Sequence, residues 1–302
     1  MKYPSEKVDA IVVGGGPAGL SGAMLLGRCR RSVLVFDEGK PRNEKSRAVH
    51  AYLGAHDVAP TELLSLGRKE LRNYANVSFF HESVASVIRE GDTFRVTLLS
   101  GMEFRSRSLL LATGIIDRLP ELPGLKDFYG KSIHLCPYCD GWESSGQRIA
   151  VMGSGDEAAE LALEMLIWSS RIVLFIDGDV PSDGLRQRLA ARQVTVEMSA
   201  VTGFLGHDGD LRAVTLQDGR QVECDRMFLV ASQVQHDDFI QRFGFGITEE
   251  GKADCGNGGE TGVPGLFIAG NAAKGLQLAM VAAAEGLHAA HGINNFLLSL
   301  DE

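Results

Sequence analysis

Short apolar runs alternate with glycine-rich turns and helix-like stretches in the first part of the chain. Residues 8–13 form an apolar run typical of a buried strand, and a glycine-rich turn at 14–19 follows at once. Residues 20–29 then have a helix-like pattern, and a second apolar run at 32–36 ends in two carboxylates, Asp37 and Glu38. Strand, turn, helix and strand in this order predict a dinucleotide-binding unit of α/β type.

The glycine turn has the spacing G-x-G-x-x-G. In this arrangement the glycines make a tight turn, let a pyrophosphate approach the backbone and pack the helix closely on the strand. The pyrophosphate lies at the helix N-terminus, and an acid after the second strand binds the ribose hydroxyls. An ordinary glycine-rich turn is the alternative. We predict an adenine-dinucleotide site at Gly14, Gly16, Pro17, Ala18, Gly19, Asp37 and Glu38.

A partial repeat of this pattern begins near residue 148. An apolar run at 148–152 leads into Gly153-Ser154-Gly155, a helix-like stretch continues to residue 168, and a second apolar run covers 171–176. Ala158 takes the place of the third glycine, which the fingerprint allows. The repeat predicts a second unit of similar architecture and leaves its ligand open.

The remaining pattern distributes the chain over two domains, the second inserted in the first. A buried strand at 108–114 ends in Ala112-Thr113-Gly114, a small turn that can close over a dinucleotide, and residues 118–124 are rich in chain breakers. We predict an α/β protein of two Rossmann-like three-layer domains, the first from residues 1–117 and 241–302 and the second from 118–240. Further expected elements are helices at 60–74 and 278–298, strands at 77–80, 83–89, 93–98 and 261–271, and a hairpin at 211–222.

Composition and charge exclude several classes of partner. The 302 residues carry a net charge of -9 with a pI of about 5.4, which gives no electrostatic footprint for nucleic acid or anionic lipid. No segment approaches ~20 consecutive apolar residues, and residues 1–5 lead into the first strand without an apolar leader. We expect a soluble cytoplasmic protein without nucleic-acid or membrane partners.

The cysteine pattern indicates redox chemistry. Five cysteines in a chain this long do not suggest a structural disulfide framework. Cys136 and Cys139 form a C-x-x-C pair that can cycle between dithiol and disulfide, and Asp140 directly after them can supply or take a proton. His134 would be a third zinc ligand, but a structural zinc site needs four, so we predict no metal site. We expect Cys29 to be a small buried hydrophobic residue.

Together these motifs resemble the low-molecular-weight thioredoxin reductases, flavoproteins of two dinucleotide-binding domains with the redox C-x-x-C in the second. The resemblance covers essentially the whole chain and includes the closing sequence Val263-Pro264-Gly265-Leu266-Phe267-x-Ala269-Gly270. It implies FAD, bound by the first domain, with Cys139 facing the flavin, Cys136 exchanging with the partner disulfide and Asp140 as acid/base. We also expect a homodimer. The further cofactor positions that it implies are Thr113, Gly114, Gly270, Asn271, Gln277, Leu278 and Ala279.

The chain departs from this family at three places. Asn271 stands where the family has an acid near the flavin ribityl chain, and Gln277-Leu278-Ala279 stands where it has Arg-Gln-Ala. Where NADPH-using members have His-Arg-Arg to hold the 2'-phosphate, this chain has Ile176-Asp177-Gly178-Asp179. Two carboxylates there repel a phosphate, so we expect NADPH to bind poorly. Either Asp177 instead holds the free 2'-hydroxyl of NADH, or the second domain has lost pyridine nucleotide altogether.

The sequence leaves the electron donor, the sulfur partner and the direction of electron flow open. The expected partner is a thioredoxin-like protein or a small-molecule disulfide or dithiol, and the donor is NADH or ferredoxin. An oxygen-dependent dithiol oxidase running in reverse is the alternative, although relatives of that kind tend to have His after the second cysteine, so Asp140 favours disulfide reduction. A flavin-bound redox sensor without turnover is a further alternative.

Two groups near these motifs have competing interpretations. His50 is expected to be a surface or packing histidine, with proton relay at the flavin edge as the alternative. Tyr138, Trp142 and Phe128 are either core residues or an aromatic docking face for a partner.

Overall fold

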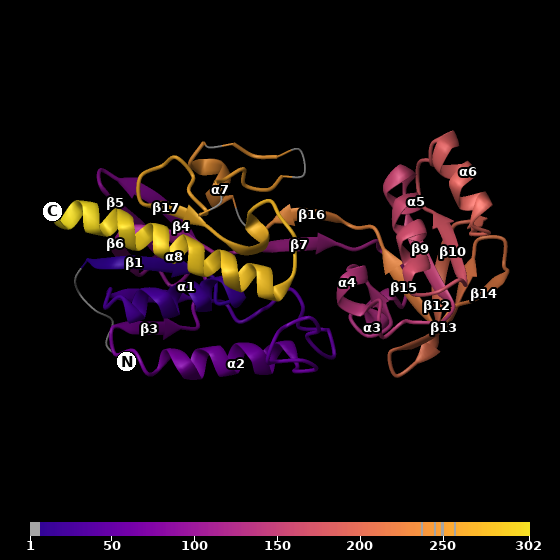
Figure 1. The fold of residues 1–302 in the computed structure, drawn as a ribbon, viewed down its shortest axis with the longest axis horizontal. Helices are drawn as coiled ribbons and strands as arrows, with labels where there is room; N and C mark the ends of the chain where they lie inside the picture. Colours follow the sequence, from indigo (N-terminus) through magenta and orange to yellow (C-terminus); the bar gives the residue numbers. More distant parts are fainter. Residues whose placement is uncertain (1–6, 237, 245, 249–250, 257) are drawn as a thin grey trace. The chain divides into compact units, whose positions relative to one another are not determined.

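The computed structural model describes residues 7–236, 238–244, 246–248, 251–256 and 258–302, so the leaderless N-terminus predicted at residues 1–5 lies outside the described residues. The chain folds into two compact units (Figure 1). Unit 1 comprises Met1–Glu44, Ala51–Ile116 and Gln233–Glu302, and unit 2 comprises Lys45–His50 and Asp117–Ser232.

Unit 1 is built on a largely parallel sheet. Strands β3, β2, β1 and β6 pair in parallel in that order, and β17 continues the sheet along the end of β6. The start of β6 pairs instead with β5 in an antiparallel meander, β4-β5-β6. Val13, Leu111 and Ile268 are in register, so the carboxyl ends of β1, β6 and β17 lie together. The strands are β1 (Val8–Val13), β2 (Val33–Phe36), β3 (Val77–Phe80), β4 (Val84–Glu90), β5 (Thr93–Leu98), β6 (Glu103–Leu111) and β17 (Leu266–Ile268).

Helices cover one face of this sheet, and the meander packs on the other. Ala10 and Val12 of β1 enter the core beneath the helices α1 (Pro17–Arg28), α2 (Pro60–Leu71) and α8 (Ala279–Asp301), whereas Ile11 and Val13 enter the core shared with β5. Helix α8 lies beside α1 (Figure 1). A Cβ on Gly286 of α8 would lie 2.0 Å from the carbonyl oxygen of Ala18, so the two helices approach closely at a glycine.

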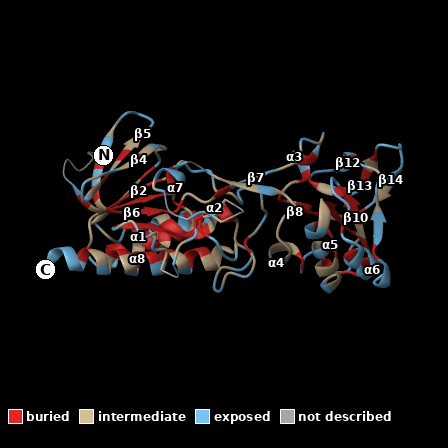
Figure 2. Ribbon diagram, turned by 90° about the horizontal axis from the view of Figure 1, so that it is seen from above, coloured by how far each residue is buried: buried red, intermediate tan, exposed pale blue. Residues whose placement is uncertain are grey.

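Unit 2 has the same three-layer plan. Helices α5 and α6 cover one face of a parallel sheet, ordered β11-β10-β9-β15-β8, and the antiparallel strands β12 to β14 form the third layer. Buried residues follow the strands between the layers (Figure 2). Its elements are β8 (Ile133–His134), β9 (Ile149–Gly153), α5 (Gly155–Glu164), η1 (Met165–Ile167), β10 (Ile172–Ile176), α6 (Asp183–Ala191), β11 (Thr195–Glu197), β12 (Val201–His207), β13 (Asp210–Leu216), β14 (Gln221–Glu223) and β15 (Arg226–Leu229), with the short helices α3 (Leu125–Phe128) and α4 (Pro137–Asp140).

The chain crosses between the units in two strands, β7 (Ile115–Arg118) and β16 (Ser232–Gln235), which pair with each other. The division places the return at residue 233 instead of the expected 241, because the polar sequence of β16 carries no strand signal. Residues 45–50 join unit 2, where the backbone of Lys45 lies against Gly130 and Arg47 forms a 3.3 Å ion pair with Asp210.

Several predicted elements have different ends. The strand expected at 108–114 begins already at Glu103, and the one expected at 261–271 is reduced to β17, since Gly262 and Gly265 have positive φ. Helix α7 (Phe239–Arg242) and the short turn η2 (Gly270–Ala272) were not anticipated. Cys29 is exposed, because α1 ends just before it, so its predicted burial is wrong. In the part of the chain that is described, no helix is long and apolar enough to cross a membrane.

Candidate active site

The first glycine turn joins β1 to α1, and its glycines serve different purposes. Gly14 has a φ of +103°, and a Cβ there would lie 2.3 Å from the carbonyl oxygen of Ala112. A Cβ on Gly19 would lie 1.9 Å from the carbonyl oxygen of Gly14. A Cβ on Gly16, the N-cap of α1, would meet nothing within 4 Å. The turn is therefore closed where helix and strand pack and open where a pyrophosphate approaches, at the first helical residues Pro17 and Ala18.

The two acids after β2 are both in contact with protein groups. Gly15 donates its N–H to Asp37 Oδ1 at 2.8 Å, and Gly39 donates to Asp37 Oδ2 at 3.1 Å. Glu38 Oε1 lies 2.9 Å from His236 Nε2. Asp37 thus ties the glycine turn to the end of β2, and because each carboxylate oxygen accepts more than one hydrogen bond, it keeps capacity for a ribose hydroxyl.

The neighbouring strand ends carry further polar groups. The Thr113 hydroxyl after β6 is buried and has no hydrogen-bond partner among the described residues, and Gly114 beside it has a φ of +70°. After β17, Gly270 donates its N–H to Glu285 Oε2 at 2.8 Å, and burial raises the pKa of this glutamate. Asn271 follows in η2. A buried hydroxyl without a partner is costly, so Thr113 indicates a ligand at this edge of the sheet.

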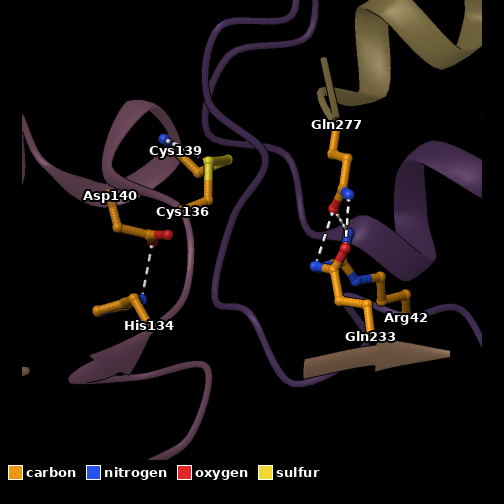
Figure 3. The surroundings of a disulfide bond; sticks show 7 residues. All are labelled: Arg42, His134, Cys136, Cys139, Asp140, Gln233 and Gln277. Atoms are coloured by element: carbon orange, nitrogen blue, oxygen red, sulfur yellow. Dashed lines mark hydrogen bonds and ion pairs between the residues drawn. A yellow bond between two sulfur atoms is a disulfide. The ribbon is translucent and has the colours of Figure 1, made fainter. Parts of the chain in front are cut away.

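An amide and guanidinium cluster lies just before α8. Gln277 Oε1 accepts from Arg42 Nη1 at 2.6 Å and from Gln233 Nε2 at 3.2 Å, and Gln277 Nε2 donates to Gln233 Oε1 at 2.7 Å (Figure 3). Leu278 is the N-cap of α8 and Ala279 its first residue. The cluster therefore ties the loop before α8 to the segment after β2 and to the returning strand β16.

In unit 2, the two cysteines of the C-x-x-C pair form a disulfide. Cys136 is the N-cap of the short helix α4, Cys139 lies within it, and their Cα atoms are 5.3 Å apart (Figure 3). The amide N–H groups of Cys139 and Asp140 both donate to the carbonyl oxygen of Cys136, at 3.2 and 3.3 Å. The turn thus fixes the backbone of Asp140, the residue directly after Cys139.

The carboxylate of Asp140 has a buried imidazole as partner. His134 Nδ1 lies 3.1 Å from Asp140 Oδ1, and the His134 side chain is only 7% exposed (Figure 3). The imidazole packs at 5.6 Å from the ring of Phe228, the residue paired with His134 across β8 and β15. His134 is therefore held by the sheet of unit 2 and contacts the carboxylate of Asp140.

Aromatic side chains beside the disulfide are exposed. Tyr138 and Trp142 are 57% and 80% exposed, and Tyr138 makes an edge contact with Trp168 at 6.1 Å. Phe128 is buried, so it belongs to the core. His50 lies in the segment assigned to unit 2, 3.6 Å from Glu143, with a side chain that is 15% exposed.

The second glycine turn, between β9 and α5, is closed by the segment after β10. Gly155 donates its N–H to the carbonyl oxygen of Asp179 at 2.7 Å, and Asp179 donates its own N–H to Ser154 Oγ at 2.8 Å. A Cβ on Gly178 would lie 2.6 Å from the same Oγ. The two segments that form this turn carry four exposed carboxylates, Asp156, Glu157, Asp177 and Asp179.

Comparison with known proteins places this geometry in a family. The sequence model of the pyridine nucleotide-disulphide oxidoreductases matches residues 8–286, which include both glycine turns and the disulfide. The chain belongs to this family. The pyridine nucleotide-disulphide oxidoreductase described here is thus a flavin-dependent enzyme, and the family implies FAD together with a nicotinamide cofactor.

Its relatives include thioredoxin reductases. A probable thioredoxin reductase of Arthroderma benhamiae is 30% identical over 302 residues, covering 89% of this chain and 75% of that protein. The thioredoxin reductase of Bacillus subtilis is 25% identical over 310 residues, covering 98% and 97%. The crystal structure of HlmI matches with a TM-score of 0.95 at 34% identity, covering 99% of this chain and 95% of that one. A putative thioredoxin reductase of Bacillus anthracis matches with a TM-score of 0.92 at 26% identity, covering 98% and 100%.

These comparisons confirm the predicted fold of two dinucleotide-binding domains and the thioredoxin-reductase resemblance. The residues of unit 1 fit FAD, because the turn is open at Gly16 and the hydroxyl of Thr113 has no partner among the described residues. Sequence reasoning named Gln277 but missed Arg42 and Gln233 around it, and it missed Glu285 and the pairing of His134 with Asp140. The local signal for Glu285 was its position as a single acid within the Ala-rich first half of α8.

Proposed function

We propose that this oxidoreductase moves electrons between FAD, the Cys136–Cys139 pair and a disulfide of a thioredoxin-like protein or a small molecule. The observation that carries the proposal is the disulfide itself, closed within a single helical turn that also holds Asp140. The favoured direction is disulfide reduction. The regions that would hold FAD are the turn of Gly14, Gly16 and Gly19 and the strand end at Thr113.

The disulfide chemistry needs a proton as well as electrons. Two electrons open the Cys136–Cys139 bond and leave two sulfurs that together bind two protons when fully reduced. Bound FAD would itself carry these two electrons to or from the disulfide. Asp140, one residue from Cys139, is the proposed acid/base for the sulfurs. Cys136 is the sulfur proposed to exchange with the partner.

The nicotinamide site determines the electron source. In unit 2 the N–H of Gly155, which a pyrophosphate would use, already bonds to Asp179, and exposed carboxylates occupy the turn. A 2'-phosphate would meet repulsion from Asp177 and Asp179 in place of arginine donors. We therefore propose that NADPH is a poor reductant, that NADH uses Asp177 for its 2'-hydroxyl, and that ferredoxin is the donor if NADH also fails.

The closed second turn also favours a second candidate function, a dithiol oxidase. Such an enzyme takes two electrons and two protons from a small dithiol, passes the electrons through the Cys136–Cys139 pair to FAD, and then to oxygen, which is reduced to peroxide. No nicotinamide site is needed in that direction. In either direction the exposed rings of Tyr138 and Trp142 would contact the sulfur substrate, since aromatic side chains supply large contact area at low entropic cost.

Anaerobic titration of the flavin absorbance tests these proposals. NADH, NADPH, reduced ferredoxin and a dithiol are added in turn, and the reagent that bleaches the flavin at stoichiometric amounts identifies one end of the path. We expect Cys136→Ser to show a long-wavelength charge-transfer band from a Cys139 thiolate, and Cys139→Ser to lack it. Full turnover by both variants would contradict the role of the disulfide, and rapid reduction by micromolar NADPH would contradict the donor assignment.

A further inference from the structure

Asp140, the acid that follows the disulfide in the chain, is paired with a buried imidazole. His134 contributes an imidazole that is almost fully buried, and its Nδ1 lies 3.1 Å from Asp140 Oδ1, a hydrogen-bond distance (Figure 3). The carboxylate is 18% exposed, so solvent reaches it only in part. The backbone fixes both partners, because His134 belongs to β8 and Asp140 closes the turn of α4.

The chemistry of such a pair differs from that of a lone carboxylate. Imidazole is the side chain that normally changes charge between pH 5 and 8, whereas a carboxylate is normally ionised in that range. With one shared proton the pair is neutral, and after losing that proton it carries one negative charge. A thiolate is therefore easier to form beside the protonated pair, because a nearby negative charge disfavours a second one.

We propose that His134 is a positioning residue that shares a proton with Asp140, so that the pair, and not Asp140 alone, gives and takes the proton when the Cys136–Cys139 disulfide opens and closes. This inference rests on the proposed redox role of the disulfide. It assigns His134 no direct contact with sulfur or substrate, because its ring lies against Phe228 and its Nδ1 faces the carboxylate of Asp140.

The reaction of the disulfide with a dithiol shows where the proton goes. A substrate thiolate attacks one sulfur, the S–S bond breaks, and its electron pair stays on the other sulfur as a thiolate. The His134–Asp140 pair protonates that thiolate. The second substrate thiol then gives its proton back to the pair and, as a thiolate, closes the substrate disulfide, which releases the first protein sulfur. The protein disulfide gains two electrons, the substrate dithiol loses two, and the shared proton is restored.

Other charges act on the same place and must be separated from His134. Arg226 on β15 interacts with Asp140, and burial lowers the pKa of this guanidinium. Asp210, Asp225 and Arg47 act on Arg226 in turn. Glu143, three positions after Asp140, contacts His50, and Glu164 faces Tyr138 on α4. His50 is a second imidazole among these groups, so its effect on thiol reactivity must be measured together with that of His134.

The test is the pH dependence of thiol alkylation in the FAD-loaded protein. The disulfide is reduced with a phosphine under argon, pulses of iodoacetamide are given between pH 5.5 and 8.5, and modification of Cys136 and Cys139 is counted by peptide mass spectrometry. The key variant is His134→Asn, because the Asn amide nitrogen can replace Nδ1 as hydrogen-bond donor but cannot titrate. His207→Asn is the matched control, since His207 lies 3.4 Å from Asp208 on the exposed surface of the same unit.

We expect His134→Asn to slow alkylation about tenfold near pH 6, because a permanent negative charge on Asp140 disfavours a neighbouring thiolate. The difference should vanish at alkaline pH, because an imidazole is normally neutral there and the carboxylate carries its charge in both proteins. His207→Asn and His50→Asn should follow the wild-type profile. A His134→Asn profile parallel to wild type at all pH values would overturn the proposal, as would a shift equally produced by His50→Asn.

Two outcomes of this test need a separate interpretation. If His134→Asn does not fold, the wild-type profile itself must show a step beyond a single thiol ionisation, and a single smooth ionisation overturns the proposal. Alkylation needs neither a nicotinamide nor a partner protein. A shifted profile in an enzyme whose disulfide never exchanges electrons with the flavin would therefore refute the proposed function and leave the His134–Asp140 pair intact.

Discussion

Replacing Gly16 with alanine separates cofactor binding from folding. The φ of Gly16 is −73° and its ψ is −175°, an extended conformation that alanine adopts without strain. A Cβ at this position would meet nothing within 4 Å. The protein itself therefore accepts the methyl group. It would project into the open side of the turn, where the FAD pyrophosphate is proposed to approach the backbone.

The two effects differ in magnitude. For folding, a glycine-to-alanine change at a compatible conformation gains about 0.4–1 kcal/mol from the unfolded chain, and alanine loses a comparable amount at an N-cap. The apoprotein should thus keep its unfolding free energy to within about 0.5 kcal/mol. For binding, loss of even one charge-assisted hydrogen bond to phosphate costs about 1.5–3 kcal/mol, so FAD affinity should fall at least tenfold.

The assay measures both quantities on the same samples. Apoprotein is unfolded in urea, and FAD binding is followed by quenching of flavin fluorescence. Gly184→Ala is the control, because its Cβ also meets nothing within 4 Å but lies on α6 of unit 2. Gly19→Ala is the contrast, since a Cβ 1.9 Å from the carbonyl oxygen of Gly14 must shift backbone and should destabilise even the apoprotein by about 1–3 kcal/mol. Wild-type FAD affinity in Gly16→Ala would show that the pyrophosphate does not bind at this turn.

Three further outcomes are expected from the packing and charges of the two units. The Arg148 guanidinium lowers the pKa of Asp225 from 3.8 to about 2, so this carboxylate stabilises the fold above pH ~4 and loses that effect as the pH falls toward 2; Asp225→Asn should cost about 1 kcal/mol at pH 7 in urea unfolding, after allowance for solvent screening, and flatten the acid slope. Burial raises the pKa of Cys224 to about 12, so iodoacetamide at pH 8 should label exposed Cys29 and spare Cys224 in the native protein, and equal labelling by mass spectrometry would contradict that packing. Gly286→Val should separate α8 from α1, lower the melting temperature by several degrees and release FAD on gel filtration, whereas an unchanged melting temperature would show that the helices can part cheaply.

The parts of the fold that sequence predicted well are those with a local physical cause. The apolar run at 8–13, the glycine turn and the helix after it are contiguous, and each glycine that packs against backbone is dictated by sterics within that unit. The start of β6 was missed for the opposite reason. Its inward positions include Ser106 and Ser108, both fully buried, with Arg105 before them and Arg107 between them, so the segment shows no apolar alternation.

The site was predictable where one motif contains it and obscure where distant segments meet. The disulfide, Asp140 and the glycine turns are apparent from spacing alone. Gln277 contacts Arg42, which lies 235 positions away in the chain, and Gln233, which lies 44 positions away. In the sequence, each of these three residues is an ordinary polar residue. His134 lies six positions before Asp140, but its role depends on β8 being buried against β15, which a two-residue strand does not reveal.

The two glycine turns show why a fingerprint predicts architecture more reliably than ligand. Both turns join a buried strand to a helix, and both have the same initial spacing. In unit 1 the segment after β2 sends a side chain, Asp37, to the turn and leaves Gly16 open. In unit 2 the segment after β10 contacts the turn through its backbone, because the carbonyl oxygen of Asp179 accepts a hydrogen bond from the N–H of Gly155. A pyrophosphate that used the N–H of Gly155 would have to displace that hydrogen bond, so the segment after β10 can block the second turn even though its glycines fit the fingerprint.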